Sequence, residues 1–265
     1  MLRFAVPVVV ASKLARSLQS ARVVALIPAR FHSTRFPGKP LALIDDRPMI
    51  EHVCRRAEQA RTVDAVAVAT DDDRIAEVVS GFGGTAVLTR ADHQTGTDRL
   101  AEVAAALDSD IVVNLQGDEP LMTGEAIDAV VRLLDERPAD VMGTLRRRID
   151  DPADLSRSDV VKVVVDTNGY ALYFSRAAVP HVRAGARRPV AWRHIGLYSY
   201  RRSFLVELAA LPPTPLERAE GLEQLRALEH GYRIRTAETT ADLIGVDAPE
   251  DLERVRQALH ASTRL

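Results

Sequence analysis

The feature that most constrains the fold of this chain is an apolar run at residues 23–27 that opens directly into a polar loop at residues 28–40. Consecutive apolar residues of this kind are typical of a strand buried on both faces, as in a parallel sheet. Because α/β sheets bind ligands at the carboxyl ends of their strands, the loop predicts a site for a triphosphate. It is not a Walker A loop, since no Ser or Thr follows the Gly-Lys pair. Its glycine, cations and hydroxyls are Gly38, Arg30, Arg35, Lys39, Ser33 and Thr34.

Lysine is scarce in this chain, which makes its lysines informative. Lys and Arg together number 35, but lysine occurs only at positions 13, 39 and 162. A lysine retained in so arginine-rich a chain indicates a site that needs a compact point charge, which the planar guanidinium cannot supply. The argument favours special roles for Lys39 and Lys162 and is weak for Lys13. The alternative is that codon bias favours arginine throughout the chain and that these lysines remain by chance.

Composition excludes several classes of function. The net charge of −2 gives no overall basic field, so we expect no nucleic-acid partner. The single cysteine, Cys54, excludes an intrachain disulfide and a cysteine-based zinc site, and it fits a reducing compartment. It lies within a helical pattern, where we expect a small buried hydrophobe. The apolar run at residues 4–11 is too short to span a bilayer, so we expect no membrane segment.

Residues 1–21 differ in composition from the rest of the chain. They contain Arg3, Lys13 and Arg16 and no acidic residue. Such a segment can be an organelle transit peptide or, less readily, a secretory signal. Against both, the strand that leads to the polar loop follows with almost no linker. We therefore expect residues 1–21 to be an N-terminal extension of a cytoplasmic protein, and residues 22–265 to form a single domain.

The first 150 residues alternate between strand and helix patterns. Strands are expected at residues 23–27, 64–70, 85–88 and 110–115. Helices are expected at residues 48–60, 74–80, 97–107 and 123–136, the last with Thr123 as its N-cap. This alternation predicts an α/β fold with a doubly wound, mostly parallel sheet.

The pattern changes to a meander from about residue 160. A hairpin is expected at residues 160–175, with Asn168-Gly169 in its turn. The later elements are expected to be a strand at 192–201, an amphipathic helix at 215–229, a strand at 232–237 and a helix at 249–259. The second half is therefore expected to add a smaller lobe to the parallel sheet.

Carboxylates follow two of these segments at positions suited to a metal. Asp118 follows a very apolar strand and faces the same crevice as the polar loop, where Mg²⁺ can be held against a nucleotide. A turn or helix-capping role is the alternative, and the neighbouring Glu119 is either a second ligand or a solvated neighbour. Asp247 precedes a helix that starts with proline, and N-capping explains it on local grounds.

Other polar clusters have both a functional and a structural interpretation. The loop at residues 90–99 could hydrogen-bond a base or sugar, or could only cap a helix. Arg176 could clamp a carboxylate through two hydrogen bonds. His194 and Tyr198 share one face of a strand. A functional role is one interpretation, and a packed strand whose polar side-chain ends are satisfied within the fold is the alternative. Glu223 lies in an ordinary amphipathic pattern, and nothing local distinguishes it.

These segments together resemble the signature of the 3-deoxy-manno-octulosonate (Kdo) cytidylyltransferase family. The resemblance covers residues 22–259 in family order, at 27–41, 69–71, 89–97, 114–120, 169–176, 194–198, 222–226 and 245–252. It implies a Rossmann-like nucleotide-diphospho-sugar transferase fold with a dimerisation lobe. It also implies a Mg²⁺-dependent nucleotidyltransferase, usually a homodimer, that converts CTP and Kdo to CMP-Kdo and pyrophosphate for lipopolysaccharide or related glycans.

The resemblance also implies a role for individual residues. Arg30 and Lys39 would hold the triphosphate and stabilise the departing pyrophosphate, and Asp118 and Asp247 would coordinate Mg²⁺. The nucleotide would be bound by Ala29, Arg30, Ser33, Lys39, Arg90, Asp92, Gly96 and Thr97. The sugar acid would be bound by Gln116, Arg176, His194, Tyr198, Glu223 and Gln224, with Arg176 facing its carboxylate. Residues 22–150 would thus mainly bind nucleotide, and residues 151–265 would mainly bind the sugar acid and form the dimer.

Two departures from the family pattern leave the acceptor open. The segment between Pro180 and Arg193 is short and arginine-rich, and residues 238–244 are trimmed. A modified Kdo or a sialate-type acid is therefore an alternative substrate. A non-catalytic nucleotide-sugar binder is a further alternative, against which the two carboxylates and Lys39 argue. A metal-dependent glycosyltransferase would more naturally carry an Asp-x-Asp motif.

Overall fold

The computed structural model describes residues 16–32, 36–186, 189–241 and 243–262. Ser33, one of the residues expected to bind nucleotide, lies outside these ranges, as do residues 1–15 of the expected N-terminal extension. The part of that extension that is described includes α1 (Arg16–Gln19), in contact with the sheet. Leu18 is only 1% exposed and packs in the core, so these residues belong to the folded domain.

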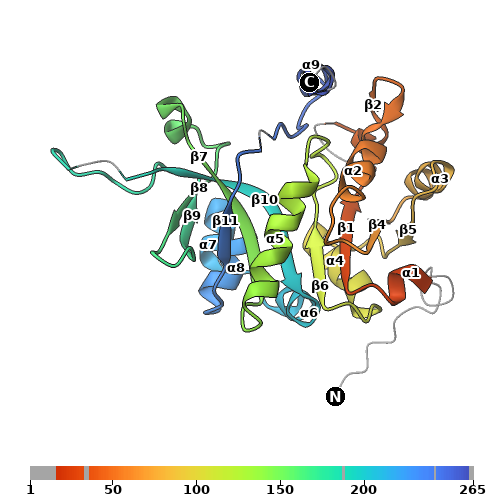
Figure 1. Ribbon diagram of the computed structural model, residues 1–265, viewed down its shortest axis with the longest axis horizontal. Helices are drawn as coiled ribbons and strands as arrows, with labels where there is room; N and C mark the ends of the chain where they lie inside the picture. The colour runs from red at the N-terminus through yellow and green to blue at the C-terminus, as the bar shows by residue number, and fades with distance from the viewer. Residues whose placement is uncertain (1–15, 33–35, 187–188, 242, 263–265) are drawn as a thin grey trace.

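One mixed sheet runs through the protein, in the strand order β11-β7-β10-β6-β1-β4-β5 (Figure 1). The central strand β1 pairs in parallel with β4 and β6, so these three strands end at the same edge. β10 runs antiparallel between β6 and β7, and β11 is parallel to β7. The strands are β1 (Val23–Ala29), β4 (Ala65–Thr70), β5 (Ala86–Leu88), β6 (Ile111–Asn114), β7 (Met142–Arg148), β10 (Trp192–Arg201) and β11 (Arg235–Glu238). The expected α/β fold is confirmed.

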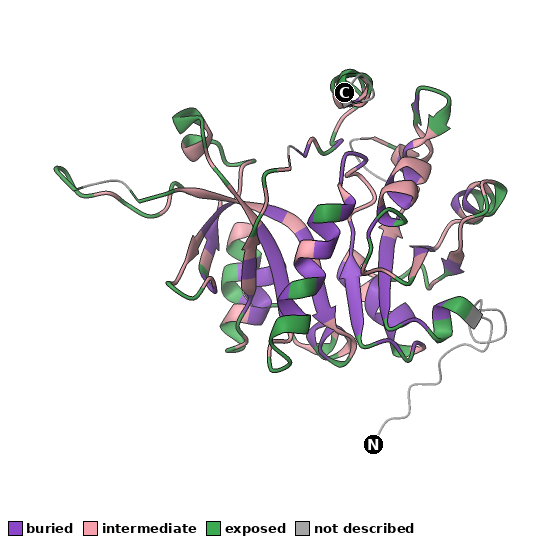
Figure 2. Cartoon of the chain, viewed as in Figure 1, coloured by how far each residue is buried: buried purple, intermediate pink, exposed green. Residues whose placement is uncertain are grey.

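Helices cover both faces of this sheet, and alternate residues of β1 separate the two layers. Val23, Ala25 and Ile27 pack in one core cluster with α2, α3 and α5. Val24 and Leu26 pack in the other, with α1, α4 and α6. Figure 2 shows the buried strands between helices whose outer faces are exposed. The helices are α2 (Met49–Ala57), α3 (Asp73–Gly81), α4 (Gly96–Ala105), α5 (Gly124–Glu136) and α6 (Arg202–Ala210).

Two local expectations in this half of the chain are confirmed. Thr123 caps α5, because its hydroxyl accepts a hydrogen bond from the Ala126 N–H. Cys54 is buried in α2 at 2% exposure, and burial raises the pKa of its thiol to about 12. A thiol with so high a pKa is inert at neutral pH.

The hairpin expected at residues 160–175 is present, formed by β8 (Lys162–Val165) and β9 (Ala171–Ser175). Gly169 adopts a φ of 82° in its turn, a conformation that favours glycine. β8 also pairs with β10, so the hairpin branches from the main sheet. The described residues between β9 and β10 extend away from the body of the molecule (Figure 1) and are exposed or half-buried.

The helix expected at residues 215–229 is interrupted, and this expectation was wrong. The structure has two short helices, α7 (Pro215–Glu220) and α8 (Gln224–Glu229). Gly221 ends α7 in the left-handed conformation, at φ 62°, and redirects the chain. Leu222 then turns into the core at 6% exposure. The amphipathic spacing did not reveal the break, because each short helix buries one face, as a single continuous helix would.

Several elements were not expected from the sequence. The polar end of β7 breaks the alternation that identifies a strand, and α6 follows β10 without a turn or a capping side chain. The small hairpin of β2 (Leu43–Ile44) and β3 (Arg47–Pro48) has strands of two residues, too short for a periodic signal. Short helical turns at Lys39–Leu41 and Pro152–Ser156 were not expected either. The helix expected at residues 249–259 is confirmed as α9 (Asp251–Ser262), which lies beside the small hairpin. Among the described helices, none has the length and apolar character needed to cross a membrane.

A bulge in β10 is fixed by a hydroxyl of the neighbouring strand. The pairing of β10 with β7 shifts between Ile195 and Tyr198. The Thr144 hydroxyl lies 2.9 Å from the Leu197 carbonyl and 3.0 Å from His194 Nε2. Since a hydroxyl has one proton and gives it to the carbonyl, we assign His194 Nε2 as the donor to the Thr144 oxygen. Burial lowers the pKa of His194 from 6.5 to about 3.

This burial predicts a loss of stability in acid. The unfolded chain binds a proton at His194 below about pH 6.5 and the folded chain does not, so the free energy of unfolding falls as the pH drops from 6.5 toward 3. Between about pH 7.5 and pH 5, His194 is expected to account for up to about 2 kcal/mol of the fall in the free energy of unfolding of the parent protein. We expect His194→Gln to lose less stability than the parent over this range, by up to that amount. Urea unfolding at the two pH values measures this difference. The exposed His181, replaced in the same way, is the control, and equal pH dependence in all three proteins would contradict the assignment.

Candidate active site

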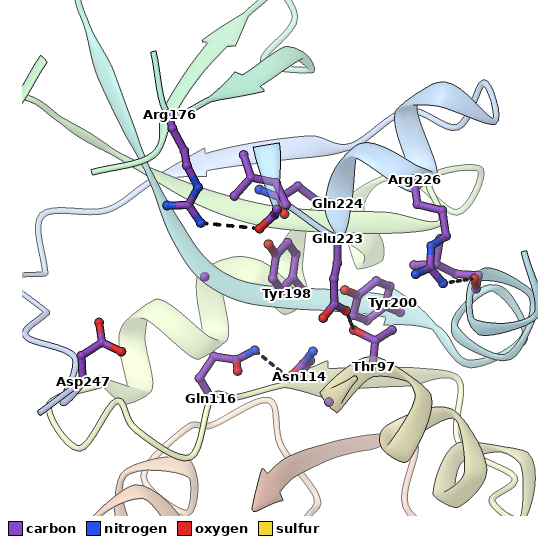
Figure 3. A pocket seen from close by; sticks show the side chains of 15 residues that line it. Thr97, Asn114, Gln116, Arg176, Tyr198, Tyr200, Glu223, Gln224, Arg226 and Asp247 are labelled. Carbon is purple, nitrogen blue, oxygen red and sulfur yellow. Dashed lines mark hydrogen bonds between the residues drawn. The ribbon is translucent and has the colours of Figure 1, made fainter. Parts of the chain in front are cut away.

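A polar pocket of about 460 Å³ lies beyond the carboxyl end of β6 and is called the main pocket below. In Figure 3, Thr97, Asn114 and Gln116 lie along one side of it, facing Arg176, Glu223 and Gln224, with Tyr198 between them. The residues expected to bind substrate or metal that line it are Gly96, Thr97, Gln116, Arg176, Tyr198, Glu223, Gln224 and Asp247. The structure thus brings together residues from α4, β6, β9, β10, α8 and the segment before α9.

The break between α7 and α8 places two of these side chains. Glu223 begins α8 and accepts a hydrogen bond from the Thr97 hydroxyl at 2.6 Å, across 126 positions of the chain. Burial raises the pKa of the Glu223 carboxyl above its usual range. Gln224 is 5% exposed, and its Nε2 has no hydrogen-bond partner among the described residues. A buried donor left open in a pocket is available to a ligand, because an unmet hydrogen bond is costly.

Arg176 is held by backbone carbonyls on the wall of the main pocket. Its Nε donates to the Glu220 carbonyl at 2.7 Å and its Nη1 to the Ser158 carbonyl at 3.0 Å. Nη2 lies 3.5 Å from the Gly221 carbonyl, which is a weak contact. The guanidinium is therefore oriented by carbonyl oxygens and has no carboxylate in its own hydrogen bonds.

A backbone hydrogen bond joins the two sides of the polar loop after β1. The Gly38 N–H donates to the Phe31 carbonyl at 2.8 Å, and a Cβ at position 38 would lie 3.3 Å from the Phe31 ring. Gly38 also has a φ of 71°, so a larger residue would be strained there as well as crowded. The Arg74 guanidinium stacks 3.3 Å from the centre of the Phe31 ring. Within the described residues, buried Arg30 Nη2 has no hydrogen-bond partner, which leaves it free for an anion.

Lys39, Asp118 and Val246 form a junction beside the main pocket. Lys39 Nζ donates to Asp118 Oδ2 at 2.6 Å and to the Val246 carbonyl at 2.8 Å. The Val246 N–H in turn donates to the Asp118 carbonyl at 2.9 Å. Asp247, the next residue, lines the main pocket. The junction therefore brings the polar loop, the end of β6 and the segment before α9 into contact.

Among the described residues no group of three His, Cys, Asp or Glu side chains is placed to hold a metal ion, so the carboxylates near this junction would bind Mg²⁺ only together with substrate phosphates and water. The ion prefers hard oxygen ligands and is usually held by one or two carboxylates together with substrate phosphates and water. Asp118 and Asp247 supply two carboxylates, and the former already faces a cation in the form of the Lys39 ammonium. A buried oxygen of Glu119, Oε2, has no hydrogen-bond partner among the described residues, so it too could meet a positive group.

Glu119, the residue after Asp118, is a half-buried carboxyl group. Burial and, to a smaller degree, the Asp118 charge raise its pKa to about 7. Its side chain lines a second hollow of about 450 Å³, together with Arg193 and His194. His194 therefore lies outside the main pocket, although its ring is in contact with Tyr198 at a centroid distance of 5.4 Å. Gly196, in the bulge of β10, borders both hollows.

Arg90 and Asp92 are also separate from the main pocket. They line a third hollow, of about 610 Å³, between the loop at 90–95 and the end of α6. Arg90 Nε lies 3.2 Å from Asp92 Oδ1, and both side chains are more than half exposed. Glu102 of α4 holds this loop, since it accepts from the Arg90 N–H at 3.2 Å and hydrogen-bonds His93.

Seven residues that line the main pocket were not identified from the sequence, and three of them carry polar side chains: Asn114, Tyr200 and Arg226. Asn114 ends an otherwise apolar strand, which was an available signal. Tyr200 is two positions beyond Tyr198 and therefore shares its face of β10. Arg226 forms a buried ion pair with Glu217 at 2.6 Å, and no local pattern reveals that pairing between two helices.

Comparison with known proteins agrees with this geometry. The chain matches the cytidylyltransferase family model over residues 24–234. It is 54% identical over 247 residues to a 3-deoxy-manno-octulosonate cytidylyltransferase of Geobacter sulfurreducens, covering 89% of this chain and 99% of the relative. A protein of the same name from Syntrophotalea carbinolica is 55% identical, with 89% and 98% covered.

Solved structures support the same assignment. A CMP:2-keto-3-deoxy-manno-octonic acid synthetase complexed with CTP superposes with a TM-score of 0.87 at 43% identity, covering 91% of this chain and 99% of that one. A 4-diphosphocytidyl-2C-methyl-D-erythritol synthase from Anaerococcus prevotii, at 13% identity and a TM-score of 0.61 over 90% and 98% of the two chains, shares the fold alone. The chain therefore belongs to the 3-deoxy-manno-octulosonate cytidylyltransferase family of nucleotidyltransferases.

Proposed function

We propose that this protein transfers CMP from CTP to Kdo, giving CMP-Kdo and pyrophosphate. The observation that carries the proposal is the junction of Lys39, Asp118 and Val246 beside the main pocket. It sets the Lys39 ammonium against the Asp118 carboxylate, and Asp247, the residue after Val246, lines the main pocket. The names of the relatives, which share half of their residues with this chain, support CTP and Kdo as the substrates.

The reaction requires positioning and charge neutralisation more than covalent catalysis. The anomeric hydroxyl oxygen of the sugar acid bonds to the α-phosphorus of CTP, the bond to the bridging oxygen breaks, and pyrophosphate leaves while the hydroxyl proton is released. Arg30 and Lys39 would hold the triphosphate and stabilise the charge that develops on pyrophosphate. Asp118 and Asp247 would hold Mg²⁺, which when bound neutralises phosphate charge and lowers the pKa of the attacking hydroxyl.

The main pocket would hold the sugar acid. Arg176 would bind the carboxylate, because its guanidinium is oriented by carbonyls and has no carboxylate partner in its own hydrogen bonds. Gln116, Tyr198, Glu223 and Gln224 would bind the hydroxyls. His194 would act from behind Tyr198, through ring contact and not from the pocket wall.

The nucleotide would lie between the polar loop and the start of α4. Ala29 ends β1 there, and Gly96 approaches the same strand, since a Cβ on it would lie 3.3 Å from the Pro28 ring. Thr97 is already engaged by Glu223, which links the nucleotide and sugar sides. The proposal that Ser33, Arg90 and Asp92 bind the nucleotide rests on the resemblance to the Kdo cytidylyltransferase family. A homodimer is proposed on the same ground, and a cytoplasmic location is proposed from the single cysteine and from the character of residues 1–21.

The first test measures pyrophosphate release with CTP and Mg²⁺, with each of four acids: Kdo, 8-amino-Kdo, Kdn and N-acetylneuraminate. We expect release with Kdo that EDTA abolishes, because the two carboxylates need the ion to bind the phosphates. Preference for another acid would retain the nucleotide chemistry and change the acceptor. No release with any acid would favour a non-catalytic nucleotide-sugar binder.

Asp118→Asn is expected to lower turnover by roughly a hundredfold or more while the protein stays folded, because one metal ligand is lost at constant volume. Steady-state pyrophosphate release measures the effect. Asp135→Asn is the matched control: Asp135 is also 35% exposed and is paired with Arg22 at 2.8 Å, but it lies away from the pocket. Near-normal turnover of Asp118→Asn would refute the two-carboxylate mechanism.

Lys39→Arg is expected to slow turnover at least about tenfold although it keeps the charge. The ammonium donates to Asp118 and to the Val246 carbonyl from a single point, and a planar guanidinium cannot occupy that position. The kcat and the KM for CTP, compared with those of Lys39→Met, separate geometry from charge. Equal rates for Lys39→Arg and the parent enzyme would show that charge alone is required.

A further inference from the structure

We propose that Lys162 is a positioning residue that holds Arg176 in the orientation needed to bind the acceptor carboxylate. The inference rests on the proposed function, in which Arg176 receives that carboxylate. Lys162 lies at the start of β8 and does not line any of the three hollows described above. It would therefore act on the substrate only through its neighbour.

The Lys162 ammonium is enclosed by backbone. The side chain is fully buried, and its Nζ donates to the carbonyls of Val160, Arg157 and Arg176 at 2.6, 2.7 and 2.5 Å. An ammonium has three N–H groups, and here each has an acceptor. In the described part of the chain Lys162 has no ion pair within 4.0 Å, and the carboxylates of Asp159 and Glu220 act on its charge only from a greater distance. A buried charge is costly to retain, so its hydrogen bonds indicate a constraint that an apolar residue could not supply.

The carbonyls that surround Lys162 belong to the two segments that orient Arg176. One is the carbonyl of Arg176 itself, which fixes the backbone from which the guanidinium extends. The others flank Ser158, whose carbonyl accepts from Arg176 Nη1 at 3.0 Å. The Lys162 ammonium therefore links the backbone of Arg176 to residues 157–160, the segment whose Ser158 carbonyl binds the Arg176 guanidinium.

Glu220 completes the arrangement from the opposite side. Its carboxylate accepts from the Ser175 hydroxyl at 2.6 Å and from the Arg176 N–H at 2.9 Å, and its carbonyl accepts from Arg176 Nε at 2.7 Å. Glu220 cannot hold the segment at Ser158, which it does not contact through these bonds. Loss of the Lys162 ammonium would therefore free one of the two ends that determine where the guanidinium points.

The geometry also accounts for a lysine at this position in an arginine-rich chain. Three acceptors converge on one atom, which a tetrahedral ammonium satisfies in three directions. A guanidinium spreads its donors over a plane and is larger, so Lys162→Arg would displace at least one of the two segments. This prediction distinguishes a need for shape from a need for charge.

The test uses the full-length enzyme with CTP, Kdo and Mg²⁺. Lys162→Met is expected to raise the KM for Kdo about tenfold and to leave the KM for CTP within about twofold, because the phosphate loop is untouched. Lys162→Arg, which keeps the charge but not the shape, is the second variant if the Met variant is unstable, and it is expected to change the same KM in the same direction. Val79→Ala, a buried truncation in α3, is the control for a general loss of stability, followed by Tm.

A double-mutant cycle with Arg176→Lys separates positioning from a merely structural role. If Lys162 acts through Arg176, then Lys162→Met should raise the KM for Kdo less than about threefold further in the Arg176→Lys background. Equal effects of Lys162→Met in both backgrounds, or parallel changes in the KM values for CTP and Kdo, would overturn the inference. If Arg176→Lys raises the KM for Kdo and neither Lys162 variant does, the inference fails and the proposed function stands. If Arg176→Lys itself has no effect, the proposed role of Arg176 fails, and the inference fails with it.

Discussion

The Lys39 ammonium, seated 2.6 Å from Asp118 and 2.8 Å from the Val246 carbonyl, is the interaction on which the rest of the site depends. Its partners lie 79 and 207 positions away along the chain. One compact charge therefore fixes the polar loop, the end of β6 and the approach to α9 against one another. Without it, Asp118 would present an uncompensated carboxylate beside the half-buried Glu119, whose pKa is already raised to about 7 by burial and by the charge of Asp118. Like charges disfavour each other's ionised form in a poorly solvated site.

The sugar side of the site is built by two interruptions of regular structure. Gly221 ends α7 and allows α8 to start at Gln224, which brings Glu223 within 2.6 Å of Thr97. The bulge of β10, held by Thr144, lets Gly196 border two hollows and turns His194 away from the main pocket. Gly221 and Gly196, the glycines of these two irregularities, both line the main pocket.

Buried cations in this protein are satisfied in two different ways. Arg226 is neutralised by Glu217 in a buried ion pair, whereas Arg176 and Lys162 donate to carbonyls. A carboxylate partner would compensate the charge of Arg176 and weaken its attraction for an anion. Carbonyl oxygens orient the guanidinium without a direct carboxylate partner, although the nearby Glu220 carboxylate interacts with its charge. We therefore regard the carbonyl shell as preparation of Arg176 for an acidic ligand, in line with the proposed function.

The sequence by itself determined the parallel core, the cationic loop after β1 and the carboxylates beyond β6 and before α9. These follow from short apolar runs and from the residues at their ends, which act over a few positions. The tertiary structure decided which of the polar residues meet. It placed Gly96, Thr97, Gln116, Arg176, Tyr198, Glu223, Gln224 and Asp247 around one pocket, and it placed His194, Arg90 and Asp92 elsewhere. The break at Gly221 and the carbonyls around Lys162 were likewise hidden, because they depend on backbone conformation and on contacts between segments that no local periodicity encodes.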